Sequence, residues 1–238
     1  ASAEIAVATE PVAERARAFA PVVWLVGKVQ SGKSSIVRTL TSSAEAEIGQ
    51  GFAACTRASR VFDFPGAAPI IRFLDTRGVG EAGYTPDEDI AFCEQQAHLI
   101  IAVVKAADMD QGTVVDVLKQ VRKRHPEWPI VVAQTTLHEL YPAGMQHPTS
   151  YPFAGAPSGW KGVPDALSRA LTFQRSLFDP IGKSQSLQFV PIDFTLPGDG
   201  MAPEDFGRGA LIDALVAAAP AAVSAVLSAL PGPADATE

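Results

Sequence analysis

An eight-residue stretch near the start of the chain constrains the fold more than any other part of the sequence. Residues 27–34 read Gly-Lys-Val-Gln-Ser-Gly-Lys-Ser and fit the pattern G-x-x-x-x-G-K-[ST]. An apolar run with the length and β-branched content of a buried strand, residues 22–26, precedes this stretch, and a segment able to begin a helix follows it from Ser35. Strand, glycine-rich loop and helix in this order predict a phosphate-binding loop.

The groups of this loop have distinct expected roles. Glycine lets the backbone fold round an anion, so that successive N–H groups and the positive end of the following helix face the phosphates. Lys33 is expected to contact the β- and γ-phosphates, and the Ser34 hydroxyl to be a ligand of Mg²⁺, a hard cation that prefers oxygen donors. The other residues of the loop expected at the nucleotide are Gly27, Lys28, Gln30, Ser31, Gly32 and Ser35.

A second pattern follows the apolar run 70–74. Asp75-Thr76-Arg77-Gly78 matches the D-x-x-G of GTPases. Asp75 is expected to hold Mg²⁺ through water, and the Gly78 N–H to reach the γ-phosphate, which only a residue without a Cβ approaches so closely. Thr56 ends a polar, glycine-bearing loop over residues 41–56 and is expected to give Mg²⁺ a second oxygen when a triphosphate is bound.

The remaining pattern predicts strands that alternate with helices. Expected strands cover residues 59–64, 70–74, 99–104, 130–133 and 187–194, and expected helices cover 12–19, 114–122 and 166–178. Pro65-Gly66 suits the turn of a hairpin between the first two of these strands. The sequence therefore predicts an α/β fold of three layers, with a mainly parallel sheet covered by helices on both faces.

One main domain is expected over residues 21–205, with an N-terminal helical extension over 1–20 and a C-terminal helical segment over 206–238. Residues 137–162 carry prolines, glycines and aromatic residues without a clear period, which predicts a long loop. Residues 206–230 are rich in alanine and leucine and contain Pro220 in the middle. They are interpreted as a terminal pair of helices packed on the sheet, rather than as a membrane contact.

Composition excludes several classes of protein. The chain has 238 residues, 47% of them hydrophobic, and a net charge of -7, which argues against a broad surface for nucleic acid. Two cysteines cannot form a disulfide framework, and no secretory leader pattern opens the chain. A cytoplasmic protein is expected. Contact with the inner membrane through the C-terminal segment, or through segments beyond the chain ends, stays open.

The order of these motifs resembles the translation-factor-related (TRAFAC) P-loop GTPases, close to the bacterial Era-like group and its 50S-ribosome-binding-GTPase type of domain. The resemblance is carried by residues 27–35, by Cys55-Thr56-Arg57 and by residues 75–81, and it covers nearly the whole chain. It implies a Ras-like fold, GTP and GDP as ligands, and Mg²⁺. It also implies two switch segments, about 44–57 and 78–93, which the γ-phosphate orders and hydrolysis releases.

One departure from the family concerns hydrolysis. Val79 stands where Ras-type enzymes have a glutamine that orients the attacking water, and a valine has no hydrogen-bonding side chain. Relatives with an apolar residue here use another group, a cation or a partner. Gln30 occupies the position at which potassium-assisted relatives have an asparagine, so K⁺ is a candidate cofactor. Arg77 is interpreted as part of a solvated ion pair rather than as a catalytic group.

The second departure concerns the base. After the strand 130–133 the family has Asn/Thr-Lys-x-Asp, whereas this chain has Thr135-Thr136-Leu137-His138. His138 replaces an aspartate that accepts two guanine N–H groups, and neutral imidazole offers one acceptor. Whether His138 contacts the base or lies outside the pocket stays open at this point. Asp193 falls in residues 190–194, where the resemblance places the last loop of the family, and is either the substitute carboxylate or a structural turn residue.

These patterns lead to the hypothesis of a Mg²⁺-dependent GTPase switch with slow turnover, in which Lys33, Thr56, Gly78 and Gln30 are the expected catalytic residues. Its expected partners are guanine nucleotide, an effector protein and a second copy through the switch segments, and no nucleic acid. The alternative is a degenerate nucleotide-binding scaffold with little hydrolysis. A P-loop kinase is a third class, and residues 75–78 argue against it.

Overall fold

The computed structural model of the protein describes residues 20–41, 52–54, 59–64, 71–76, 86–182 and 187–228. The expected helix over residues 12–19 and the extension to which it belongs lie outside these ranges, as do Thr56, Arg77, Gly78 and Val79. Within the described ranges, no helix is long and apolar enough to cross a membrane.

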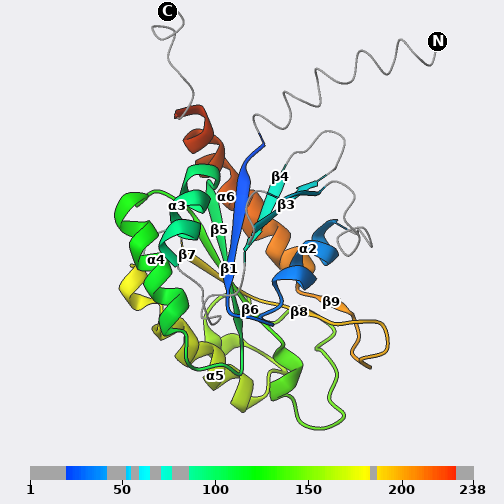
Figure 1. Ribbon diagram of the computed structural model, residues 1–238. Helices are drawn as coiled ribbons and strands as arrows, with labels where there is room; N and C mark the ends of the chain where they lie inside the picture. Colours follow the sequence, from blue (N-terminus) through cyan, green and yellow to red (C-terminus); the bar gives the residue numbers. More distant parts are fainter. Residues whose placement is uncertain are drawn as a thin grey trace, which may run out of the picture.

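A sheet forms the centre of the molecule (Figure 1). It has seven strands in the order β2-β3-β4-β1-β5-β6-β7. Its central strand β1 pairs in parallel with β4 and β5, and β5–β6 and β6–β7 are parallel as well. Only β2–β3 and β3–β4 are antiparallel, which agrees with the predicted hairpin of residues 59–74. The strands are β1 Val22–Gly27, β2 Phe52–Ala54, β3 Ser59–Phe64, β4 Ile71–Thr76, β5 Leu99–Lys105, β6 Ile130–Thr135 and β7 Leu187–Pro191.

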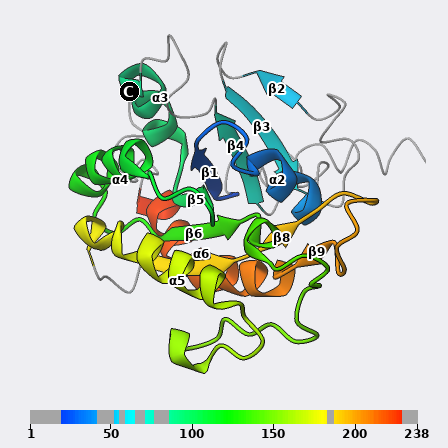
Figure 2. The same ribbon diagram turned by 90° about the horizontal axis from the view of Figure 1, so that it is seen from below.

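Helices cover both faces of this sheet, so the predicted three-layer α/β fold is confirmed (Figure 2). The helices are α2 Lys33–Thr41, α3 Pro86–Gln96, α4 Gly112–Arg124, α5 Asp165–Ser176 and α6 Arg208–Ser228, and short 3-10 helices are η2 Leu137–Leu140, η3 Pro157–Gly159 and η4 Asp179–Ile181. One core cluster joins the sheet to α3 and α4, and a second joins it to α2 and α6.

Alternation along the central strands explains the two cores. Neighbouring residues of a strand point to opposite faces, so Trp24 and Leu25 enter different clusters although both are buried. The parallel register sets Trp24 beside Ile100 and Leu25 beside Ile101, which keeps each face continuous from strand to strand. Continuous apolar runs are therefore required in β1, β5 and β6, because both of their faces are covered.

Three elements differ from the sequence-based expectation. β2 lies within the range 41–56 that was expected to be a loop, and α2 begins at Lys33 rather than after Ser34. The single strand expected over residues 187–194 is divided into β7 and β8 (Asp193–Phe194), and β8 pairs with β9 (Asp205–Phe206) outside the main sheet. The division follows from the neighbouring strand, because β6 ends at Thr135 and offers no further partner.

The expected pair of C-terminal helices is wrong, because α6 is one helix that continues through Pro220. Proline removes one backbone N–H and with it a hydrogen bond of the helix. Pro220 is exposed, whereas Ala218 and Ala222 on either side of it are buried against the sheet. Packing of the small residues thus holds the helix together across the proline.

The predicted loop over residues 137–162 has little regular structure but contains a small core of its own. Tyr151, Phe153 and Trp160 pack with Phe206, and the Phe153 and Trp160 rings meet edge to face at 5.1 Å between centroids. The aromatic residues are thus not scattered surface groups. They form one cluster with Leu137, which follows the end of β6, and with Phe206 of β9.

Replacing Pro220 tests whether packing against the sheet offsets the hydrogen bond that the proline removes from α6. Pro220→Ala restores the backbone donor at an exposed position, and should raise the free energy of unfolding by about 1–3 kcal/mol in chemical denaturation. Pro142→Ala is the matched control, because Pro142 is exposed in a loop and has no helix to repair. If Pro220→Ala gives no more stability than this control, the described helix carries no penalty at residue 220.

Candidate functional site

The candidate phosphate-binding loop connects β1 to α2. Two of its residues have backbone conformations that few amino acids adopt easily. Gln30 has a φ of 57° and Gly32 a φ of 99°, both in the left-handed region. Such a conformation is strained for glutamine and easy for glycine, and strain of this kind concentrates at functional sites. The chain thereby turns sharply enough for α2 to begin at Lys33, with its N-terminus facing the loop.

Lys33 is held inside this turn. Its side chain is buried, and Nζ donates hydrogen bonds to the carbonyl oxygens of Gly27 and Lys28, each at 3.1 Å. The ammonium group therefore lies at the centre of the loop rather than in solvent, where a positive charge would attract a phosphate. Ser34, the next residue, is exposed at the start of α2.

Gly27 permits the close packing of this loop against β5. A Cβ at residue 27 would collide with the carbonyl oxygen of Val103 and would come within 2.6 Å of Ser31 Oγ. Ser31 itself is buried. The first glycine of the motif is thus needed for space, and the second for its backbone conformation.

Lys28 forms an ion pair with a residue outside the sequence motif. Its Nζ donates to Asp108 Oδ2 at 3.0 Å and to the backbone carbonyl of Asp110, two residues of the connection between β5 and α4. The Lys28 and Asp108 side chains are both about one third exposed or less. This contact ties the phosphate loop to the connection between β5 and α4, which the sequence motif does not predict.

Asp75, the expected magnesium residue, lies in β4 directly beside the strand that leads to the loop. The parallel register sets it next to Leu25, two residues before Gly27. Ser34 and Asp75 supply a hydroxyl and a carboxylate, the hard oxygen donors that suit Mg²⁺. In the described part of the chain, no group of three or more His, Cys, Asp and Glu side chains forms a metal cluster. A Mg²⁺ site here would therefore depend on phosphate oxygens and water as well.

Thr135 joins the phosphate loop to the candidate base site. Its Oγ1 donates to the carbonyl of Ser31 at 2.8 Å, and its side chain lies next to Gly32. Thr136 follows with a left-handed φ of 53°, and its hydroxyl donates to the Thr135 carbonyl at 2.8 Å. The end of β6 and the loop after β1 are thus fixed to each other by a direct hydrogen bond.

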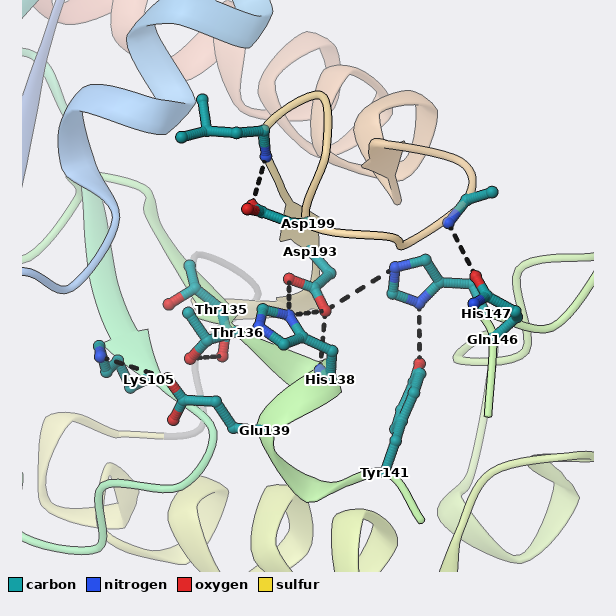
Figure 3. A network of polar contacts seen from close by, with 12 residues as sticks. Lys105, Thr135, Thr136, His138, Glu139, Tyr141, Gln146, His147, Asp193 and Asp199 are labelled. Atoms are coloured by element: carbon teal, nitrogen blue, oxygen red, sulfur yellow. Dashed lines mark hydrogen bonds and ion pairs between the residues drawn. The ribbon is translucent and has the colours of Figure 1, made fainter. Parts of the chain in front are cut away.

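His138 and Asp193, which are 55 positions apart in the sequence, form the centre of the candidate base site (Figure 3). The His138 backbone N–H donates to Asp193 Oδ2 at 2.8 Å, and His138 Nδ1 lies 2.9 Å from Oδ1 and 2.8 Å from Oδ2. The Asp193 side chain is only 1% exposed, whereas that of His138 is 35% exposed. Solvent or a ligand can therefore reach the histidine, and the carboxylate lies behind it.

A second layer, which sequence reasoning missed, surrounds the carboxylate. His147 Nε2 lies 3.8 Å from Asp193 Oδ2, its Nδ1 is 3.0 Å from the Tyr141 hydroxyl, and its ring stacks on Phe206 at 4.3 Å. Burial lowers the pKa of His147, although the charge of Asp193 opposes this, and burial together with Asp193 raises the pKa of Tyr141. His147 is therefore neutral at neutral pH, and Tyr141 keeps its proton for the contact with His147.

The structure brings most described candidates to one edge of the sheet, at the carboxyl ends of β1, β4, β5 and β6. These are Gly27, Gln30, Ser31, Gly32, Lys33, Ser34, Ser35, Asp75, Thr135, Thr136, His138 and Asp193. Ligands of open α/β sheets bind at this edge. Lys28 belongs to the same loop but is engaged by Asp108 and Asp110.

Comparison with known proteins gives a family for about half of the chain. The family model described as 50S ribosome-binding GTPase matches residues 22–135. That range runs from β1 through the phosphate loop and Asp75 to Thr135. No curated protein is similar enough in sequence to count as a relative.

Solved structures with related folds are distant in sequence. A dimerisation-deficient mutant of Toc33 from Arabidopsis thaliana has a TM-score of 0.51 at 14% identity, and the alignment covers 87% of this chain and 86% of Toc33. At that identity the likeness concerns the fold alone.

Two further structures have lower scores. Elongation factor SelB from Methanococcus maripaludis with the GTP analogue GPPNHP has a TM-score of 0.47 at 16% identity, and a mutation variant of SsGBP has 0.47 at 13%. They cover 84% and 86% of this chain, but the chain spans only 34% of SelB and 58% of SsGBP.

A methyl group at residue 27 tests how tightly the phosphate loop packs. Gly27→Ala should lower the free energy of unfolding by about 1–3 kcal/mol, because the backbone of β5 cannot move aside cheaply. Gly159→Ala is the control, since a Cβ there meets no atom within 4 Å. Urea denaturation of both variants gives the comparison, and equal stability would mean that the loop does not lie as close to Val103 as described.

Proposed function

Because residues 22–135 belong to the 50S ribosome-binding GTPase family of P-loop GTPases, we propose that this protein binds GTP with Mg²⁺ and hydrolyses it to GDP and phosphate as a molecular switch. The position of Lys33 is the observation that carries the proposal. Its ammonium group is held by two carbonyl oxygens inside a loop that leads into a helix N-terminus. Charge, backbone N–H groups and helix dipole all favour a phosphate at this point.

In the proposed complex, Lys33 contacts the β- and γ-phosphates, and the backbone of residues 27–35 surrounds them. Ser34 holds Mg²⁺ directly, Asp75 holds it through water, and Thr56 adds an oxygen in the triphosphate state. The ion neutralises charge that develops on the phosphate oxygens. The proximity of β4 to β1 supports this set, because it brings Asp75 to the strand that leads into the loop.

The proposed base site lies at Thr135, Thr136 and His138. The hydrogen bond from Thr135 to Ser31 supports this assignment, because it fixes the distance between the phosphate loop and the end of β6. Asp193 is proposed to act behind His138 rather than on the base, since its side chain is buried and faces His138.

Hydrolysis is proposed to be slow without help. Val79 has no group that orients water, so the remaining aids are Lys33, the backbone N–H of Gly78, and a cation or partner. Gln30 is a candidate ligand of K⁺, and the exposure of its side chain within the phosphate loop supports this role. Segments 44–57 and 78–93 are the proposed switches, through which an effector or a second copy would act.

The departures at Val79 and His138 favour one second candidate function. A nucleotide-binding scaffold would keep the phosphate loop and need neither a water-orienting residue nor strict choice of base. Single-turnover hydrolysis separates the two, because a scaffold keeps its triphosphate.

Removal of the Lys33 charge tests the phosphate site. Lys33→Ala should weaken GTP binding at least about 100-fold in titration calorimetry with Mg²⁺, because a buried charge-assisted contact of about 3 kcal/mol or more is lost. Lys119→Ala is the control, since Lys119 is an exposed lysine of α4 paired with Asp116. Unchanged affinity in a Lys33→Ala protein that is folded by circular dichroism would remove the phosphate-site assignment.

Exchange of the monovalent cation tests how GTP is hydrolysed. Intrinsic turnover should be on the order of 10⁻⁴ s⁻¹ in Na⁺, as in unaided Ras-type enzymes. K⁺ should accelerate single-turnover phosphate release, and Gln30→Ala should abolish the difference between the two salts. Equal rates in K⁺ and Na⁺ would exclude Gln30 as a cation ligand, and no release in either salt would favour the scaffold.

A further inference from the structure

We propose that His138 reads the base through one hydrogen-bond acceptor, Nε2, and that the pocket therefore takes 6-oxopurine nucleotides as a class, hypoxanthine as well as guanine. Asp193 is the positioning residue that makes Nε2 an acceptor. The inference rests on the proposed nucleotide binding and specifies which substituents of the base are recognised.

The orientation of the His138 ring is the first step. Nδ1 faces both oxygens of Asp193, and Figure 3 shows the ring edge that carries Nε2 on the side of Thr135 and Thr136. Among the residues that the structure describes, no hydrogen bond engages Nε2. The ring is partly exposed and lies two residues after Thr136, so Nε2 is the atom that it presents to a ligand beside the phosphate loop.

The carboxylate decides which ring nitrogen carries the proton. An ionised carboxylate only accepts hydrogen bonds, so Nδ1 must donate to Asp193, and the neutral ring then has a bare, accepting Nε2. The His138 backbone N–H also donates to Oδ2, which holds the carboxylate in place independently of the ring. His147 and Tyr141 close the site on the far side and keep Asp193 out of solvent.

A single acceptor distinguishes fewer bases than an aspartate does. The two oxygens of an aspartate accept the N1–H and the 2-amino group of guanine together, whereas Nε2 pairs with N1–H alone. Hypoxanthine has the same N1–H and lacks only the 2-amino group, so it loses nothing at this contact. Adenine presents an unprotonated N1, and two acceptors then face each other without a hydrogen between them.

Competition among three triphosphates tests the proposed pocket. With a fluorescent GTP analogue as the probe, ITP should displace it within about threefold of GTP, and ATP should be at least about tenfold weaker than both. Preference for GTP over ITP by more than about tenfold would overturn the single-acceptor inference while the proposed GTP binding stands. Failure of GTP itself to bind would reject the proposed function.

The role of Asp193 is tested by Asp193→Asn. The substitution replaces one of the two carboxylate oxygens that face Nδ1 by an amide N–H donor, which favours the ring tautomer in which Nδ1 accepts. The proton of the ring then moves to Nε2, which becomes a donor. The ratio of ATP to GTP affinity should rise by about tenfold or more, whereas loss of a merely structural residue would weaken both nucleotides equally.

Two further measurements keep the result interpretable if Asp193→Asn fails to fold. Nitrogen-15 NMR of His138 in the unaltered protein should find the proton on Nδ1 and none on Nε2, and a proton on Nε2 would overturn the proposal. His138→Phe keeps the backbone N–H and an aromatic ring, and should remove the preference for GTP over ATP. Asp199→Asn is the control, because Asp199 is an exposed carboxylate of the next turn that accepts a hydrogen bond from the Leu196 N–H at 2.7 Å.

Discussion

Parallel pairing of β1 with β4 and β5 is the constraint on which the rest of this molecule depends. It puts the carboxyl ends of the strands at one edge, and both faces of the central strands are buried, so a change of register would disrupt the packing of both cores. The phosphate loop, Asp75 and Thr135 all leave the sheet at that edge. The functional geometry is thus a consequence of strand pairing before any polar contact is considered.

Polar contacts between loops then refine this edge. Thr135 joins the end of β6 to the phosphate loop, Lys28 joins the loop to the connection after β5, and His138 joins β6 to β8 through Asp193. The partly exposed ion pair of Lys28 and Asp108 adds little stability by itself. The contact between His138 and Asp193 matters more for stability, because the Asp193 carboxylate is only 1% exposed and a buried carboxylate requires hydrogen-bond partners. The candidate base site therefore rests on buried hydrogen bonds as well as on partly exposed contacts.

The proposed binding of the phosphates and the proposed binding of the base depend on different kinds of group. Phosphate binding relies on backbone groups and on Lys33, which any chain with this loop supplies. In the proposed pocket, the choice of base relies on His138 and on the Asp193 carboxylate that acts through it, an arrangement that substitutes one acceptor for two. A pocket of this kind remains selective against adenine by repulsion and gives up selectivity within the oxopurines, because selectivity for a group requires a partner for that group.

Local patterns in the sequence determined the phosphate loop, the buried central strands and the alternation of strands and helices, because each depends on residues only a few positions apart. Residues 27–34 and the apolar runs of β1, β5 and β6 could be identified for this reason. Tertiary structure alone decided the division of β7 from β8, the unbroken α6 and the aromatic core of residues 137–162. The division depends on where the neighbouring strand ends, and the helix and the aromatic core depend on packing between residues that are distant in the sequence. Tertiary structure also decided that Asp193 lies behind His138 and that Asp108 holds Lys28. These partners are 55 and 80 positions apart, and their meeting depends on which strands become neighbours.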